Sequence, residues 1–142
     1  MKIKFVAAIF LCLVLSAISI DATSQRQSDV QGFWKNFKAA IEKEDKNAIA
    51  ALTKFPLSMP YGVKSVKTKA DFLKRYKEIF NGEADAAKCF PKAELIKDNA
   101  KNYSIYCGFK QTPDDTENTP IKYYFELTKT GWKFAGLNNI NE

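Results

Sequence analysis

The amino-acid sequence predicts an α+β domain, with helices in the first half of the chain and an antiparallel sheet of about four strands in the second half. Up to residue 82 the apolar residues recur every three or four positions, which is the spacing of one face of a helix. From residue 92 onward they alternate with polar residues, which is typical of half-buried strands. Because such a sheet must bury one face, we expect the helices to cover it.

The N-terminus has the three-part pattern of a secretory signal. Lys2 and Lys4 precede an unbroken apolar run over residues 5–15, and small residues follow up to Ala22. The apolar run is shorter than the roughly 20 residues that span a bilayer, which favours a cleaved signal over an uncleaved membrane anchor. We therefore expect cleavage at a small residue between Ala17 and Ala22, most favourably after Ala22.

Removal of residues 1–22 would leave residues 23–142 as a single domain, which is long enough to bury a hydrophobic core. The segment takes two lysines and one aspartate with it, so the net charge of +6 becomes +5. We expect an exported protein, periplasmic or secreted, with no membrane span after cleavage. Its basic character suits an anionic surface or simple solubility, and export argues against nucleic acid as a partner.

The first helix is predicted by its aromatic face. Apolar residues recur at helical spacing through residues 30–41, and the lysines fall on the opposite face. Ser28, followed three residues later by Gln31, has the spacing of a capping box and is expected to open this helix. Asp45 is expected to open a second, short helix, which Pro56 would end because the residue before a proline avoids the helical conformation.

A connector and a third helix follow. Residues 55–66 contain two prolines and a glycine, so we expect a connector there, with at most a short strand over residues 61–66. Thr68 and Asp71 form a second capping-box pattern, at the start of a segment with one apolar face. Gly82 is placed to end this helix in the left-handed conformation that glycine adopts readily.

Four strands are predicted in the second half of the chain. Residues 92–97 and 102–110 alternate around a turn cluster, and a polar, proline-bracketed loop covers residues 111–120. Residues 122–137 form a hairpin that turns at Thr128–Gly131. Together these segments predict a meander in which sequential strands are neighbours.

Two cysteines remain after signal cleavage, and an exported protein oxidises such a pair readily. With the turn between the first two strands near residues 99–100, Cys89 and Cys107 come out nearly opposite each other, and a bend at Pro91 would correct the offset. We therefore expect a cross-strand or strand-edge disulfide between them. Two independent buried thiols are the alternative.

The order of the elements resembles a known superfamily. A helix leads into "ALTKFPL", the helix "TKADFLKRYKEIF" and several strands follow, and the chain closes on "TGWKFAGL". Over the whole mature chain this order is similar to the superfamily named after nuclear transport factor two, especially its exported bacterial members of unknown function. The resemblance implies a cone-shaped, cystatin-like fold with a cavity at its open end, and dimers are common there. The superfamily includes enzymes and ligand-binding proteins, so the fold does not select a function.

The composition excludes several chemistries. The chain contains no histidine, which removes Ser-His-Asp and Cys-His nucleophile systems, histidine acid–base catalysis and nearly all zinc sites. The acidic loop at residues 114–117 does not match a calcium-loop pattern. The carboxylates fall at helix ends, in loops or out of phase with the apolar faces, so we assign no catalytic residue, no metal and no cofactor.

The aromatic residues have two interpretations, core packing or the lining of a pocket for an apolar ligand. Core packing is favoured, and Trp132 is assigned to the core. Tyr76 and Tyr123 are the best candidates for ligand contacts, because a buried hydroxyl needs a hydrogen-bond partner that a ligand could supply. Tyr61 is placed at the mouth of the cavity.

Taken together, the sequence favours an exported small-ligand-binding or protein-interaction module without catalytic activity. Its partner would be a small apolar ligand or an envelope protein. The alternative is a lyase- or isomerase-type enzyme that acts on a small apolar substrate in the cone cavity. A third alternative is a homodimer whose cavity is filled by side chains. The lysine-rich segment 64–77 is expected to be a solvated face rather than a docking site.

Overall fold

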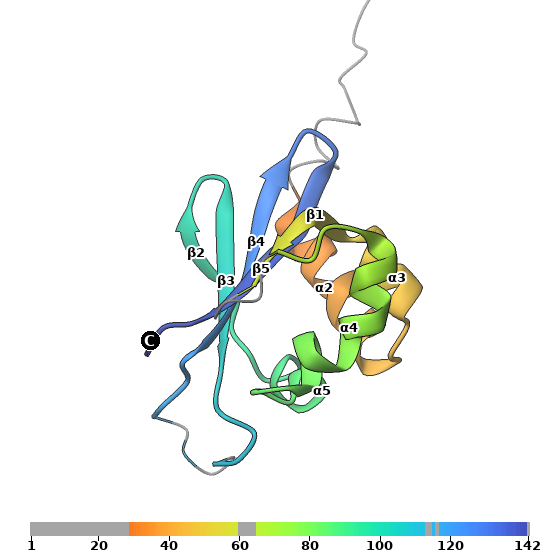
Figure 1. Ribbon diagram of the computed structural model, residues 1–142. Coiled ribbons are helices and arrows are strands. Elements are labelled where there is room, and N and C mark those ends of the chain that lie inside the picture. The colour runs from red at the N-terminus through yellow and green to blue at the C-terminus, as the bar shows by residue number, and fades with distance from the viewer. Residues whose placement is uncertain (1–28, 60–64, 113–114, 116, 142) are drawn as a thin grey trace, which may run out of the picture.

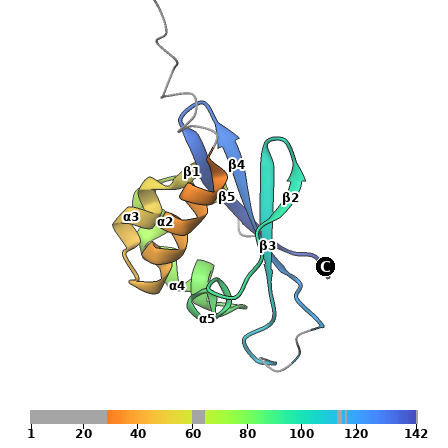
Figure 2. The ribbon, with the colours of Figure 1, turned by 180° about the vertical axis from the view of Figure 1, so that it is seen from behind.

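The protein is an α+β domain in which the described helices lie on one face of a single curved sheet, as the two opposite views in Figures 1 and 2 show. The computed structural model describes residues 29–59, 65–112, 115 and 117–141. The expected signal segment 1–22 and Tyr61 lie outside these residues. None of the helices in the described ranges has the length and apolar character needed to cross a bilayer.

Four helices are described, and each of them has a side-chain cap at its N-terminus. Their bounds are Val30–Glu42 (α2), Lys46–Ala51 (α3), Lys69–Asn81 (α4) and Ala86–Cys89 (α5). Helix α2 is capped by Asp29, whose Oδ1 accepts a hydrogen bond of 2.9 Å from the Gly32 amide. The expected cap at Ser28 is therefore wrong by one position, because the neighbouring aspartate is an equally good capping residue.

Helix α4 begins as the sequence predicts and ends differently. Thr68 Oγ1 accepts a bond of 3.1 Å from the Asp71 amide and donates one of 2.8 Å to the Asp71 carboxylate, so the second cap is confirmed. Gly82 has a φ of −81°, so the expected left-handed cap is wrong. Glycine is required there for a different reason, because a Cβ atom would collide with the carbonyl oxygen of Glu78.

The sheet has five strands rather than about four, and it is mixed rather than purely antiparallel. The strands are Thr53–Ser58 (β1), Ile96–Asn99 (β2), Asn102–Cys107 (β3), Ile121–Thr128 (β4) and Gly131–Asn139 (β5), in the spatial order β1-β5-β4-β3-β2. Strands β2 to β5 form the predicted antiparallel meander, in which Lys97 pairs with Tyr103. The first of these strands is shorter than the expected segment 92–97 and begins later.

Strand β1 is the one strand of this sheet that the sequence did not predict. It lies parallel to β5, with Thr53 opposite Phe134, and it occupies the segment that we assigned to a helix end and a connector. Helix α3 ends at Ala51, before Pro56 can act as a stop. A proline is tolerated in β1 because the strand lies at the edge of the sheet. In the expected strand 61–66, the described part is a single bridge between Leu57 and Val66.

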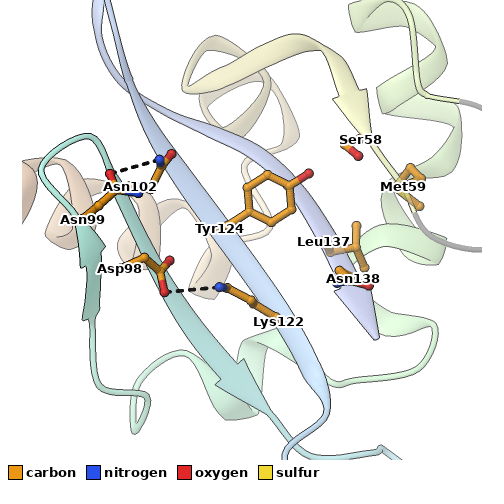
Figure 3. Close-up of a pocket in the computed structure, with 9 residues that line it drawn as sticks. All are labelled: Ser58, Met59, Asp98, Asn99, Asn102, Lys122, Tyr124, Leu137 and Asn138. Atoms are coloured by element: carbon orange, nitrogen blue, oxygen red, sulfur yellow. Dashed lines mark hydrogen bonds and ion pairs between the residues drawn. The ribbon is translucent and has the colours of Figure 1, made fainter. Parts of the chain in front are cut away.

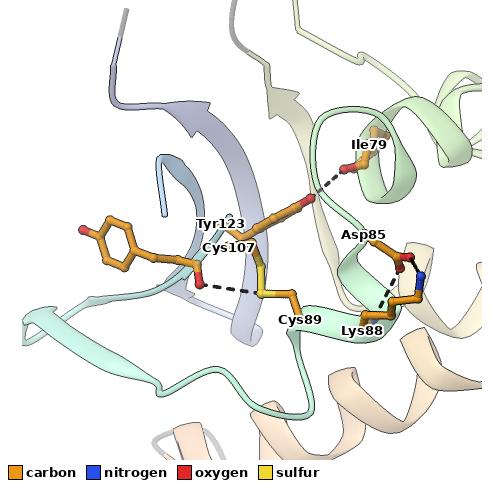
Figure 4. The surroundings of a disulfide bond; sticks show 7 residues. Ile79, Asp85, Lys88, Cys89, Cys107 and Tyr123 are labelled. Carbon is orange, nitrogen blue, oxygen red and sulfur yellow. Dashed lines mark hydrogen bonds and ion pairs between the residues drawn. A yellow bond between two sulfur atoms is a disulfide. The ribbon is translucent and has the colours of Figure 1, made fainter. Parts of the chain in front are cut away.

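The disulfide joins a helix to the sheet (Figure 4). Cys89 and Cys107 are bonded, with their Cα atoms 5.8 Å apart, so the predicted pairing is confirmed. The predicted geometry is wrong, because Cys89 ends helix α5 and only Cys107 lies on a strand. Asp85 caps this unpredicted helix by accepting a bond of 3.3 Å from the Lys88 amide. The bond therefore fixes the segment between α4 and the sheet to the far end of β3.

The space between the helices and the sheet is filled with aromatic rings. Phe37 on α2 is fully buried, and its ring centroid lies 5.4 Å from that of Phe125 and 5.6 Å from that of Phe134. The aromatic residues assigned to the core are all buried, which confirms the core interpretation: Phe33, Trp34, Phe37, Phe72, Tyr76, Tyr123, Phe125, Trp132 and Phe134. The interior of the described fold is thus a packed core of rings.

Replacement of Phe37 by alanine is expected to lower the free energy of unfolding by about 3–5 kcal/mol, as for other buried aromatic residues. The measurement is chemical denaturation of the wild type and the variant. Lys35→Ala, an exposed position on the same helix, serves as the control and should change the free energy by less than about 0.5 kcal/mol. A loss below about 1 kcal/mol for Phe37→Ala would place the ring outside the core.

Reduction of the disulfide is expected to cost about 3 kcal/mol, because the bond closes a loop with a sequence separation of 18 residues. Thiol labelling of the unreduced, exported protein should find neither Cys89 nor Cys107 reactive. Labelling of both cysteines in that sample would contradict the pairing. The Cys89→Ala/Cys107→Ala double variant should unfold at the same denaturant concentration as the reduced wild type.

Candidate functional site

Tyr123, a predicted ligand contact, lies in the centre of the core. Its side chain is 1% exposed, and its hydroxyl donates a hydrogen bond of 3.1 Å to the carbonyl oxygen of Ile79 (Figure 4). Burial, assisted by the negative charges of Glu83 and Asp85, raises the pKa of Tyr123 well above its ordinary value. The hydroxyl therefore has the partner that we expected a ligand to supply.

Tyr76 belongs to the same core. Its ring centroid lies 5.1 Å from that of Phe80, which also stacks on Tyr123 at 6.1 Å. Burial, with a smaller contribution from the charge of Glu44, raises the pKa of Tyr76 to about 12. The structure thus brings Tyr76 and Tyr123 together around one phenylalanine, whereas Tyr61 lies outside the described residues. Their role as ligand contacts stays a prediction, and the contacts described here are those of a packed core.

The buried interior holds few polar side chains. Among the described residues, the buried polar positions are Thr53, Ser104 and Asn139, and none of them is an acid. No group of three or more metal-ligating side chains occurs in that part of the chain either. Trp132 is 6% exposed and packs edge-on against Tyr103 at 5.3 Å, so its assignment to the core is confirmed. Its indole Nε1 is buried and has no hydrogen-bond partner in the described part of the chain.

A pocket of about 490 Å³ opens on the other face of the sheet, away from the helices (Figure 3). Successive residues of a strand point to opposite faces, so Lys122 and Tyr124 face outward where Tyr123 faces inward. Segments from all five strands, with Met59 just after β1, contribute to the lining: Ser58, Met59, Asp98, Asn99, Asn102, Lys122, Tyr124, Leu137 and Asn138. We call this the outer-face pocket.

Tyr124 lies across the middle of the outer-face pocket, between the two asparagines of the β2–β3 hairpin and the end of β1 (Figure 3). It pairs directly with Gly136 on β5. A Cβ atom on residue 136 would collide with the Tyr124 hydroxyl and would lie 2.7 Å from the Ser58 carbonyl oxygen. Glycine at this position therefore allows the tyrosine ring to lean over β5 toward β1.

A charged pair forms one side of the pocket. Asp98 Oδ1 accepts bonds of 3.2 Å from Lys122 Nζ and 3.1 Å from the hydroxyl of Ser104, which is fully buried. The ammonium group of Lys122 also lies 5.6 Å from the centre of the Tyr106 ring. Burial lowers the pKa of Lys122, but the hydrogen bond and charge of the Asp98 carboxylate, together with the neighbouring Tyr106, outweigh burial, and the net pKa is raised. The Lys122 ammonium therefore lies against the Asp98 carboxylate, and the two charges compensate each other.

Amide side chains form the opposite side. Asn99 Oδ1 accepts bonds of 2.8 Å from the Lys101 amide and 3.1 Å from Asn102 Nδ2, so the two asparagines orient each other. Each of these amides keeps a second polar atom without a partner among the described residues, and so does the side chain of Asn138. The pocket therefore offers both donors and acceptors on uncharged groups.

This pocket was not predicted from the sequence, because its residues alternate with the core positions as solvent-facing residues do. The available signal was the density of amide and acidic side chains in "KDNAKN", which is predicted as a turn cluster, and in "LNN". What brings these segments together is the pairing of five strands, and no local pattern encodes that.

Comparison with known proteins gives structural matches alone: no family model and no curated protein matches the sequence. The chain is similar to hexachlorocyclohexane dehydrochlorinase LinA-type3 from Novosphingobium barchaimii LL02 (12% identity, 84% of this chain and 87% of that chain, TM-score 0.43). It is similar to an NTF-2 like protein of unknown function from Shewanella oneidensis MR-1 (13% identity, 77% of this chain and 93% of that chain, TM-score 0.43). It is also similar to a domain of unknown function with a cystatin-like fold from Nostoc punctiforme (14% identity, 89% of this chain and 80% of that chain, TM-score 0.41).

The matched structures are described as NTF2-like proteins and as a domain with a cystatin-like fold, which is the fold that the order of the elements resembles. At these identities the similarity concerns the arrangement of helices and strands. Activity and ligand have to be argued from the site itself.

The buried tyrosines predict that the protein loses stability at alkaline pH. An unfolded tyrosine ionises near pH 10, whereas folded Tyr76 stays neutral up to about pH 12. Between these values the unfolded state binds fewer protons, so the free energy of unfolding falls as the pH rises. Urea denaturation of Tyr76→Phe from pH 8 to pH 12 should show a smaller fall than the wild type, by about 2 kcal/mol at pH 12. An unchanged or steeper fall in the variant would contradict the burial of this hydroxyl.

Proposed function

We propose that the protein is an exported, non-catalytic module that binds a small polar ligand in the outer-face pocket. The observation that carries this proposal is the contrast between the two faces of the sheet. On the helix side, fully buried rings such as Phe37 and Phe134 fill the interior. On the other side lies a pocket whose volume of about 490 Å³ is within the range of small-molecule sites, about 300–1,000 Å³.

The side chains that line the outer-face pocket favour a polar ligand, in place of the apolar ligand that we expected from the sequence. A ligand in the cone interior would have to displace packed rings, which is costly because such cores have native packing density. A ligand in the outer-face pocket meets three asparagines, a serine, a tyrosine and a compensated ion pair, with Met59 and Leu137 at one side. A polar ligand satisfies these groups, whereas an apolar one would leave them desolvated and unpaired.

The lyase- or isomerase-type alternative needs a carboxylate that is free to take a proton from a substrate. The carboxylate in the outer-face pocket, Asp98, is already engaged by Lys122 and Ser104. The described core contributes no buried acid. These contacts favour binding over catalysis.

The expected export agrees with the bond between Cys89 and Cys107, because disulfides persist in oxidising compartments.

A native mass spectrum of the protein isolated from its own compartment tests the proposal. We expect a polar small molecule to be retained by the wild type and lost from Tyr124→Ala, while Lys74→Ala, an exposed control on α4, retains it. The same spectrum reports whether the protein is a dimer. A ligand-free wild type, or an apolar molecule that Tyr124→Ala still holds, would contradict binding at this pocket.

A further inference from the structure

We propose that the ligand of the outer-face pocket is an uncharged, hydroxyl-rich molecule, and specifically a short segment of a neutral saccharide. This inference rests on the proposed function, and it adds the chemical class of the ligand. Three features of the pocket lead to it: the compensation of its charges, the mixture of hydrogen-bonding groups on its walls, and the exposed face of one aromatic ring.

The charges of the pocket compensate one another before any ligand arrives. Lys122 and Asp98 are 3.2 Å apart, with side chains only 24% and 26% exposed. Farther along the same face, Lys54 and Glu126 form a second pair at 2.7 Å. A charged ligand would meet, beside the group that attracts it, the opposite member of the Lys122–Asp98 pair only 3.2 Å away, so attraction and repulsion would largely cancel. A neutral ligand leaves the pair intact.

The hydrogen-bonding groups suit hydroxyls. A side-chain amide offers both donors and an acceptor, and a hydroxyl can serve as either partner. Asn99 and Asn102 hold each other in place at 3.1 Å, and each keeps one polar atom for a ligand. Asn138 faces them from β5, and the hydroxyl of Ser58 lines the β1 side. A molecule with several hydroxyls on its rim can bond to these groups at the same time, whereas a ligand with a single polar group would leave most of them unpaired.

The ring of Tyr124 supplies the apolar surface between these walls. It leans over Gly136, where any side chain would displace it, and Leu137 and Met59 lie at the β1–β5 side of the pocket (Figure 3). A pyranose ring has a face of C–H groups and a rim of hydroxyls. It therefore matches an aromatic face bordered by amides, since an aromatic side chain gives a large apolar contact with little loss of side-chain entropy. The pocket volume of about 490 Å³ leaves room for more than one such ring.

Calorimetric titration with a defined set of trisaccharides tests the inference. The probes are cellotriose and N,N′,N″-triacetylchitotriose as neutral saccharides, trigalacturonic acid as an anion, glucosamine trimer as a cation, and indole as a planar apolar ligand. We expect at least one neutral trisaccharide to bind in the low-micromolar range, roughly −8 kcal/mol, which is tight enough to be retained on isolation. The charged trimers and indole should bind at least tenfold more weakly.

Variants of the pocket residues test where the saccharide binds, and they separate the contribution of the Tyr124 ring from that of the charge of the pocket. Tyr124→Ala should weaken the neutral trisaccharide at least tenfold, whereas Tyr124→Phe, which keeps the ring, should weaken it less than threefold. Asn138→Asp brings a new negative charge into the pocket and should shift the preference toward the glucosamine trimer. Thermal unfolding of each variant verifies that it is folded, and Lys74→Ala should bind as the wild type does.

The outcomes separate this inference from the proposed function. If a charged trimer or indole binds best and Tyr124→Ala abolishes that binding, the saccharide class is wrong and the pocket remains the site. If neither neutral trisaccharide binds at about 10 mM, or binding is unchanged in Tyr124→Ala, the inference is overturned. If in addition the native mass spectrum shows no retained molecule, the proposed function fails as well.

Discussion

The packing of Phe37 against the sheet is the contact on which the rest of the structure depends. This ring comes from the middle of α2 and meets Phe125 and Phe134 of the two central strands. Helix α4 adds Phe80 at 6.3 Å, and the segment after α5 adds Phe90 at 6.2 Å. Aromatic rings bury more area than other side chains, so this cluster attaches both long helices to one face of the sheet. It also fills the space between these helices and the sheet.

Aromatic rings cover one face of the sheet, so the polar side chains of the strands lie on the other face. Each strand that points a core residue inward points its neighbours outward, so Tyr123 in the core implies Lys122 and Tyr124 outside. Gly136 then determines how Tyr124 lies, because any side chain there would meet its hydroxyl. The polar pocket is thus a consequence of the same alternation that builds the core. Under the proposed function, the two faces divide stability and recognition between them.

The sequence predicted the parts of the fold that depend on local patterns. The cap formed by Thr68 and Asp71, the aromatic core and the cysteine pairing are of this kind. Strand β1 was missed because it is short, contains Pro56 and pairs in parallel with the last strand in the chain, an interaction far away in sequence. The outer-face pocket was missed for the same reason. Its walls come from both ends of the sheet, and their residues individually have the pattern of solvent-facing positions.

The central claim is that the interior is filled and leaves recognition to the outer face. A crystal structure determined under xenon pressure tests it most directly, because xenon enters empty apolar cavities and finds no room in a packed core. We predict no xenon atom between α2 and the sheet. A well-occupied xenon atom among Phe37, Phe80 and Tyr123 would contradict the account, since it would show an open apolar cavity in the interior and would return the ligand site to the cone.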